Sequence, residues 1–252
     1  MLHNIWDAVL YHPLINALAF LVSIVPGGDL GIAVILLTIL VKLILFPLSQ
    51  KSLENQAAMT MLAPELNKIK KSGATKEEQA RMTFELYKKH KTNPFSGCLL
   101  VLIQIPIIFA LYYVFYKGIK FDAGVIYSFI HVPEEINTVF LGILDLNAKS
   151  IFLAVLAGIS QYLQAYFMPT PAPSSSSDSS DPNSFAESFS KSMAMQMKYI
   201  FPFIVAFIAY SISGAIALYW IVSNLFSVAQ QVYVNKTEKK RLDKEVEVLI
   251  HE

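Results

Sequence analysis

The sequence of 252 residues has few of the side chains on which most soluble proteins and metalloenzymes depend. Only 15% of its residues are charged, whereas about a quarter is usual in soluble domains. The single cysteine excludes an internal disulfide framework, and the five histidines lack the H-x-x-H and H-E-x-x-H spacings of zinc sites. The net charge of +1 gives no electrostatic basis for binding nucleic acid. The sequence therefore predicts neither a metalloenzyme nor a protein with specific nucleic-acid binding.

Apolar residues, by contrast, make up 54% of the chain. A helix needs about 20 mainly apolar residues to cross a membrane, because lipid cannot hydrogen-bond with exposed backbone. The last apolar stretch, residues 199–234, holds no charged side chain and would be about 50 Å long as one helix. The Ser-Ile-Ser-Gly sequence at residues 211–214 therefore predicts a tight turn inside it. We predict five spans in total: residues 30–50, 96–116, 150–168, 199–213 and 215–234.

Basic residues predict how these spans are oriented, since short loops rich in Lys and Arg stay on the cytoplasmic side. With the N-terminus outside, the cytoplasmic segments 51–95, 169–198 and 235–252 hold 16 of these residues, and the outer loop 117–149 holds 3. The sequence therefore predicts an all-α, multi-pass membrane protein with its N-terminus outside and a cytoplasmic C-terminal tail.

Two flanking segments have patterns of their own. Residues 1–29 predict an amphipathic helix on the outer interface followed by a turn, with Asp29 as the N-cap of the first span; a signal peptide is less favoured because the basic start is missing. Residues 51–95 predict a cytoplasmic helical hairpin, with an apolar stripe interrupted at Pro64 and a capping-box pattern at Thr75 and Glu78. The hairpin is either a solvated connector or a mobile element that receives an apolar client. The Ser- and Pro-rich loop 169–198 is of low complexity and is assigned no role.

Polar side chains occur inside the predicted spans, where they are costly. Lys42 lies in the first span, and an ammonium near mid-span costs about 2.5–3.5 kcal/mol. It could extend to the inner head groups or face a hydrated interior. Its spacing from Thr38 favours the interior, and no Asp or Glu lies within any span to pair with it. The site therefore attracts negative charge.

Other spans contribute polar positions as well. Those of the last span follow one another at intervals of four, three and four, which places them on one helix face. Each alone could be an interhelical hydrogen bond, but together they predict a hydrated cavity. The full candidate set for a substrate-binding groove is Lys42, Thr38, Gln104, Gln161, Gln164, Trp220, Asn224, Ser227 and Gln231.

Several of these residues lie in motifs that resemble the YidC/Oxa/Alb family of membrane-protein insertases. The motifs occur in the family's order over nearly the whole chain: LTILVKLILFPLSQKS, PELNKIKK, LYKKHKTNPFSGCLLVLIQIPIIFALYYV, FLGILDL, GISQYLQAYFMP and ALYWIVSNLFSVAQQ. The resemblance implies five spans around a hydrophilic groove, with Lys42 replacing the family's arginine. It also implies that Thr38 and Trp220 contact substrate and that Gln161 or Gln164 lies on the groove wall.

The expected function is a membrane-protein insertase and chaperone that moves polar client tails partway through the bilayer and releases apolar helices sideways into lipid. No P-loop or nucleophile–base pattern is present, so no enzyme activity, cofactor or metal is expected. The expected partners are newly made membrane proteins and the bilayer, with the ribosome and a Sec-type translocon as further candidates. The expected location is the plasma (inner) membrane of a bacterium. One alternative is a small transporter or channel with an anion site at Lys42; another is a chaperone that holds subunits without inserting them.

Overall fold

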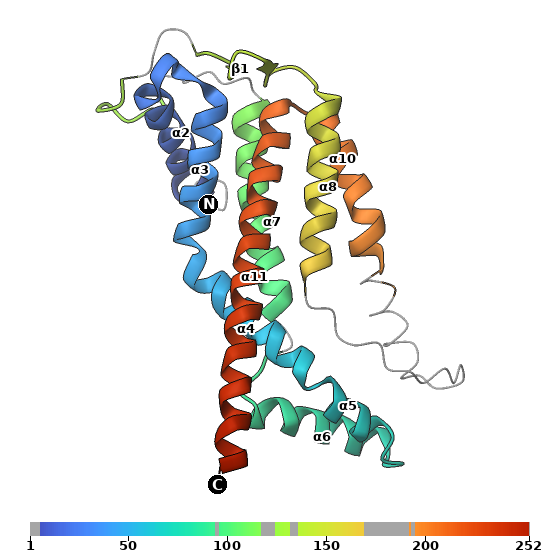
Figure 1. The fold of residues 1–252 in the computed structure, drawn as a ribbon. Helices are drawn as coiled ribbons and strands as arrows, with labels where there is room; N and C mark the ends of the chain where they lie inside the picture. The colour runs from blue at the N-terminus through green and yellow to red at the C-terminus, as the bar shows by residue number, and fades with distance from the viewer. Residues whose placement is uncertain are drawn as a thin grey trace.

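The computed structural model describes residues 6–93, 96–116, 124–131, 136–168, 192 and 195–251. An upright bundle of helices dominates it (Figure 1). The bundle helices are α2 (His12–Ile24), α3 (Leu30–Ile44), α7 (Ser96–Tyr116), α8 (Ile151–Phe167), α10 (Phe201–Ser211) and α11 (Gly214–His251). Short turns of other helix types are η1 (Asp7–Tyr11), η2 (Pro26–Gly28) and η3 (Gln196–Ile200). Most of the predicted Ser- and Pro-rich loop lies outside the described residues.

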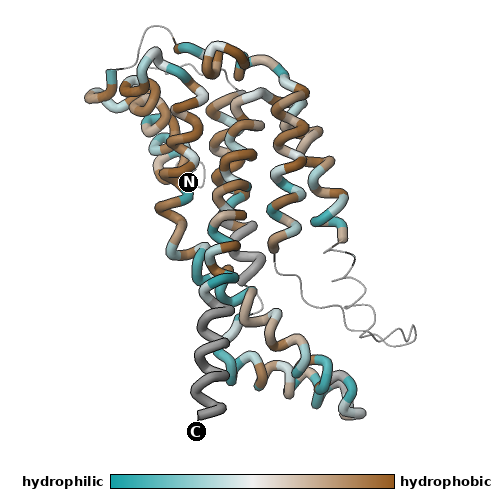
Figure 2. The backbone as a smooth tube through the Cα atoms, in the orientation of Figure 1, coloured by the Kyte–Doolittle hydropathy of each residue, from teal (hydrophilic) through white to brown (hydrophobic). Residues whose placement is uncertain are grey.

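Three further helices form an arm at one end of the bundle: α4 (Phe46–Met61), α5 (Ala63–Lys70) and α6 (Lys76–Lys89). We call this the arm end. Figure 2 shows that the bundle is mainly apolar, whereas α5 and α6 carry many hydrophilic residues. The capping box predicted at Thr75 is confirmed, because its hydroxyl accepts the N–H of Glu78 and the Glu78 carboxylate accepts the Thr75 N–H at 3.0 Å. The predicted break near Pro64 falls at Leu62, between α4 and α5.

The opposite end, which we call the loop end, carries the only strands in the described part of the chain. Strand β1 (Val139–Phe140) pairs antiparallel with β2 (Leu144–Asp145), so the fold is helical with one small exception to the all-α prediction. The turn between the strands has positive φ at Leu141 and Gly142, 51° and 72°. This hairpin contains the FLGILDL motif.

The side chain of Asp29 links two segments of the loop end, the start of α3 and the strand hairpin. As predicted, its side chain caps α3, with Oδ1 accepting the N–H groups of Gly31 and Ile32 at 2.7 and 3.1 Å. Its other oxygen accepts the N–H of Leu141 at 2.8 Å, and the residue is only 6% exposed. One buried carboxylate therefore fixes both the start of α3 and the strand hairpin.

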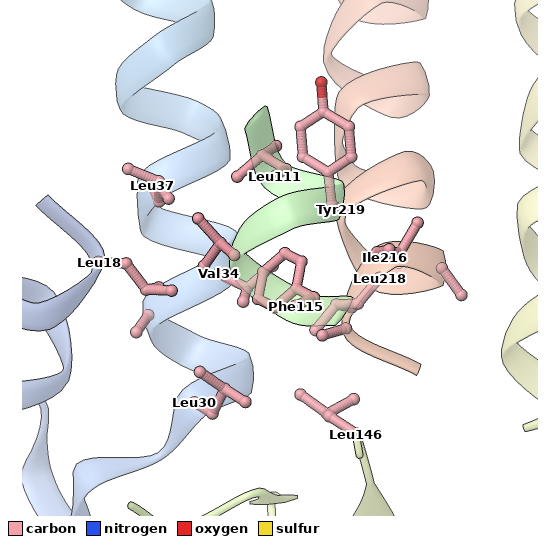
Figure 3. Close-up of a cluster of buried hydrophobic side chains, with 14 of the residues drawn as sticks. Leu18, Leu30, Val34, Leu37, Leu111, Phe115, Leu146, Ile216, Leu218 and Tyr219 are labelled. Carbon is pink, nitrogen blue, oxygen red and sulfur yellow. The ribbon is translucent and has the colours of Figure 1, made fainter. Parts of the chain in front are cut away.

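The apolar core fills the bundle next to the loop end. Figure 3 shows its side chains converging from α2, α3, α7 and α11, together with Leu146 from the loop after β2. Leu18, Leu30 and Leu146 have no exposed surface. Backbone hydrogen bonds from Gly214 and Ala215 to the carbonyls of Ala148 and Leu146 hold the start of α11 against the same loop. The turn predicted at residues 211–214 is present between α10 and α11.

The first predicted span, residues 30–50, is not one straight helix. Helix α3 ends at Ile44, α4 begins at Phe46, and their axes differ by 64°. Pro47 explains the break, because proline lacks a backbone N–H and its ring collides with the carbonyl four residues earlier. Helix α7, by contrast, continues as helix on both sides of Pro106.

Length and composition qualify two stretches as membrane spans on their own, Asp7–Ile24 and Gly214–Thr237, and a third if α3 and α4 are taken together. The apolar helices Gln104–Phe115, Ile151–Phe167 and Gln196–Ser211 are shorter. The predicted tail, residues 235–252, continues α11 as helix through His251. Helix α2 packs beside α3 and is itself apolar.

Candidate functional site

Lys42 lies in the last turn of α3, directly before the bend. Its Nζ donates a hydrogen bond to Ser227 Oγ on α11 at 3.0 Å, and the Ser227 hydroxyl donates to the carbonyl of Ser223 at 2.9 Å. The partly buried amine therefore reaches a neighbouring helix instead of extending away from the bundle. Its partner is a neutral hydroxyl, which leaves the positive charge uncompensated by that contact.

Asn224 connects α11 to α8 one turn nearer the loop end. Its Nδ2 donates to Ser160 Oγ at 3.0 Å and to Gln161 Oε1 at 3.2 Å. All three residues are at most 6% exposed. Two members of the predicted set, Asn224 and Gln161, are thus hydrogen-bonded to each other.

Gln104 connects α7 to the same helix. Its Nε2 donates to the hydroxyl of Tyr219, a residue that the sequence reasoning did not include. In Figure 3 the Tyr219 hydroxyl points away from Leu30 and Leu146, toward the arm end. A second row of polar side chains on α11 could have indicated Tyr219. Tyr219, Ser223 and Ser227 follow one another at intervals of four residues and so share one helix face.

The remaining predicted residues are less directly connected. The Thr38 hydroxyl donates to the carbonyl of Val34 in its own helix at 2.7 Å, and Thr38 is 2% exposed. Gln231 Nε2 donates to Asn235 Oδ1 along α11 at 2.8 Å. Trp220 is half-buried against the apolar core, and Gln164 is half-buried on α8.

The residue next to Gln231 was also missed and makes more interhelical contacts. Gln230 is 6% exposed, and its side-chain amide bonds Ser49, Gln50 and the carbonyl of Phe46, all at the start of α4. Either glutamine fits the helical period of the polar row. Only the position of α4 after its bend makes Gln230 the one that faces it.

The hydrogen-bonded side chains around α11 form what we call the polar cluster: Lys42, Gln104, Ser160, Gln161, Tyr219, Asn224 and Ser227. It supplies neutral donors and acceptors and one cation. Among the described residues no group of three His, Cys, Asp or Glu side chains could hold a metal ion. These features define a class, the helical membrane proteins that enclose polar side chains within an apolar bundle.

Comparison with known proteins identifies the family. Residues 20–241 match the family described as 60Kd inner membrane protein. The membrane protein insertase YidC of Magnetococcus marinus is 34% identical over 92% of this chain and 36% of its own length. The YidC of Geobacter sp. (strain M21) is 31% identical over 92% of this chain and 38% of its own length.

A solved structure of an active YidC insertase shares the fold, with a TM-score of 0.54 and 24% identity over 89% of this chain and 45% of that one. The chain belongs to the 60Kd inner membrane protein family, to which the YidC proteins are similar over the same region, as its motifs predict. It spans less than half the length of the curated relatives it matches.

Proposed function

We propose that this chain is a membrane-protein insertase that uses the polar cluster to lower the energy of moving a client's polar tail into the bilayer. The observation that carries the proposal is the hydrogen bond between Lys42 and Ser227, which holds a cation beside the other side chains of the polar cluster in a mainly apolar bundle. The names of the relatives, each a membrane protein insertase, support the same activity.

The physical task is a problem of desolvation. A peptide or hydroxyl group that loses water without a new partner costs several kcal/mol, so a polar tail does not cross hydrocarbon unaided. The side chains of Gln104, Asn224 and Ser227 can exchange their present hydrogen bonds to neighbouring side chains for bonds to such a tail. The Lys42 ammonium attracts acidic tail residues. The client's apolar helix, once next to lipid, leaves because its burial there outweighs these weak contacts.

We further propose five spans, with the N-terminus outside and the arm end in the cytoplasm. Nine basic residues in segment 51–95 support this orientation of the arm. Asn16 supports an outer position of the loop end, because its side chain bonds the loop residues Val125, at the carbonyl and 2.9 Å, and Tyr127, at the N–H and 2.7 Å. Irregular backbone of this kind is not tolerated against lipid. In this orientation the groove would open toward the cytoplasm and lipid, and the chain would lie in a bacterial plasma membrane.

The central test compares Lys42 variants in proteoliposomes during cell-free synthesis of a client with an acidic N-terminal tail. Lys42→Ala and Lys42→Glu should reduce insertion by about tenfold, the equivalent of about 1.4 kcal/mol, because the charge-assisted contact is lost. Lys42→Arg should retain insertion. Protection of the tail from external protease measures the result.

Two controls make this test specific. Lys149→Ala removes an exposed lysine of the outer loop and should leave insertion unchanged. A client whose tail carries no acidic residue should be much less sensitive to Lys42. Equal insertion by all Lys42 variants would remove the charge from the mechanism.

A photocrosslinking residue at Trp220 should label the client. Solute flux through client-free liposomes, lost in Lys42→Ala, would instead favour the transporter or channel.

A further inference from the structure

The local backbone alone does not fix the angle between α3 and α4. The axes of the two helices differ by 64°, and Pro47 cannot donate a hydrogen bond across the break. The backbone that remains, with the Ser49 N–H bonded to the carbonyl of Leu45 at 2.9 Å, sets the bend only locally. The direction of α4, and with it the whole arm, depends on contacts with another element.

Helix α4 packs against both α7 and α11, and Gln230 is the polar point of contact on α11. Its Nε2 lies 2.9 Å from Ser49 Oγ and 3.4 Å from both Gln50 Oε1 and the carbonyl of Phe46. The Ser49 hydroxyl in turn lies 3.1 Å from Gln230 Oε1. A single buried amide therefore spans the first turn of α4, including a carbonyl near the break.

An apolar contact continues the same interface toward the arm. Leu53 and Ala57 lie four and eight residues after Ser49, on one face of α4, and Val234 lies four residues after Gln230. These three side chains form a small buried cluster of their own, separate from the main core. Helix α11 thus holds α4 by one polar and one apolar contact in succession.

The same face of α11 also contacts Lys42 on the other side of the bend. Ser227, which accepts the Lys42 hydrogen bond, lies three residues before Gln230. Helix α11 therefore braces α3 through Ser227 and α4 through Gln230 at almost the same level. A change in the angle at Leu45 alters both contacts together.

We propose that Gln230 and Ser49 form a positioning clamp that sets the direction of the arm and, through the bend, the place of the Lys42 ammonium. This inference rests on the proposed insertase function. The clamp is made of neutral hydrogen bonds, which exchange partners at little net cost. It holds the arm near the polar cluster in the resting protein and can open when a client competes for the same groups.

A matched pair of substitutions tests the hydroxyl without changing shape. Ser49→Thr keeps the hydroxyl, and Ser49→Val has the same size without it. Spin labels at Lys88→Cys in α6 and Lys236→Cys in α11, both exposed, report the distance from arm to α11 in a Cys98→Ser background. The clamp predicts one narrow distance distribution for the parent and Ser49→Thr, and a broader one for Ser49→Val and Gln230→Leu.

The rate of client insertion should fall in the variants whose spin-label distance distributions broaden. Ser49→Val and Gln230→Leu should slow insertion about fivefold, the effect of losing one or two hydrogen bonds, and Ser49→Thr should restore it. The clamp proposal is contradicted if Ser49→Val and Ser49→Thr give the same distance distribution and the same insertion rate, whether both match the parent or both are impaired. A parent protein that inserts no client would overturn the proposed function, while the distance measurement would still decide the clamp.

Discussion

The two ends of the bundle are stabilised in different ways. At the loop end, completely buried leucines surround helix starts that are fixed by backbone hydrogen bonds and by Asp29. At the arm end, the helices meet through neutral side-chain hydrogen bonds such as those of Gln230, together with a cluster of only three buried apolar residues. The loop end is closely packed, whereas the side-chain hydrogen bonds of the arm end can be replaced by bonds to water or to a peptide.

This difference suits a protein that must stay sealed on one side of a membrane and open on the other. Packed leucines leave no room for water, so in the proposed arrangement the loop end would be a barrier to solutes. Exchangeable hydrogen bonds let the arm end change without losing the fold. Substitutions at matched positions in the two ends therefore distinguish a sealed end from an adaptable one.

The largest effect is expected for Asp29→Ala at the loop end. Loss of the N-cap costs about 1 kcal/mol, and the partly buried hydrogen bond from the Leu141 N–H to this carboxylate is lost as well, which costs about 1.5–3 kcal/mol more because the acceptor is charged. The thermal midpoint of the detergent-solubilised protein should fall markedly. Asp29→Asn, which keeps one carbonyl oxygen for the cap, should be intermediate. An unchanged midpoint in Asp29→Ala would show that this end is not held by the carboxylate.

A smaller effect is expected for Gly31→Ala in the first turn of α3. A Cβ at this position would overlap the ring of Phe140, so the strand hairpin must shift, at a cost of about 1–3 kcal/mol. Gly124→Ala is the control, because a Cβ there meets nothing within 4 Å. Equal midpoints for the two variants would contradict the tight packing of the loop end.

The smallest effect is expected for Thr75→Ala in the arm. Thr75 is an N-cap like Asp29, but its hydrogen bonds are exposed to solvent. The substitution should cost about 0.5–1 kcal/mol and be confined to the first turn of α6. Faster amide exchange over residues 76–79, with an unchanged global midpoint, is the expected result, and Thr75→Ser should restore slow exchange. A fall in the thermal midpoint as large as that of Asp29→Ala would show that the two ends do not differ in this way.

Much of this contrast can be predicted from local sequence patterns. The caps at Asp29 and Thr75, the turn before Gly214 and the polar face containing Asn224 all depend on residues within one or two helical turns. Short-range geometry decides such features, and the spacing of side chains reports it directly.

Features that depend on two distant segments were harder to predict. The sequence contains both Pro47 and Pro106, but the helix is interrupted next to the first and continues through the second, a difference that depends on the packing around each helix. Gln230 and Gln231 are adjacent, and the direction of α4 decides which one reaches it. The hydroxyl of Thr38 satisfies its own helix, a common competitor of interhelical bonding that spacing alone does not reveal.

The shortness of two neighbouring helices has a consequence for the lipid itself. Helix α8 has 17 residues and the stretch Gln196–Ser211 has 16, so they are about 26 and 24 Å long, against a hydrocarbon thickness of about 30 Å. Acyl chains beside them must compress by several ångströms to avoid exposing the helix ends. In the proposed five-span arrangement the bilayer would be thinnest where α8 and α10 lie together, and a hydrophilic client segment would have the least distance to cover there.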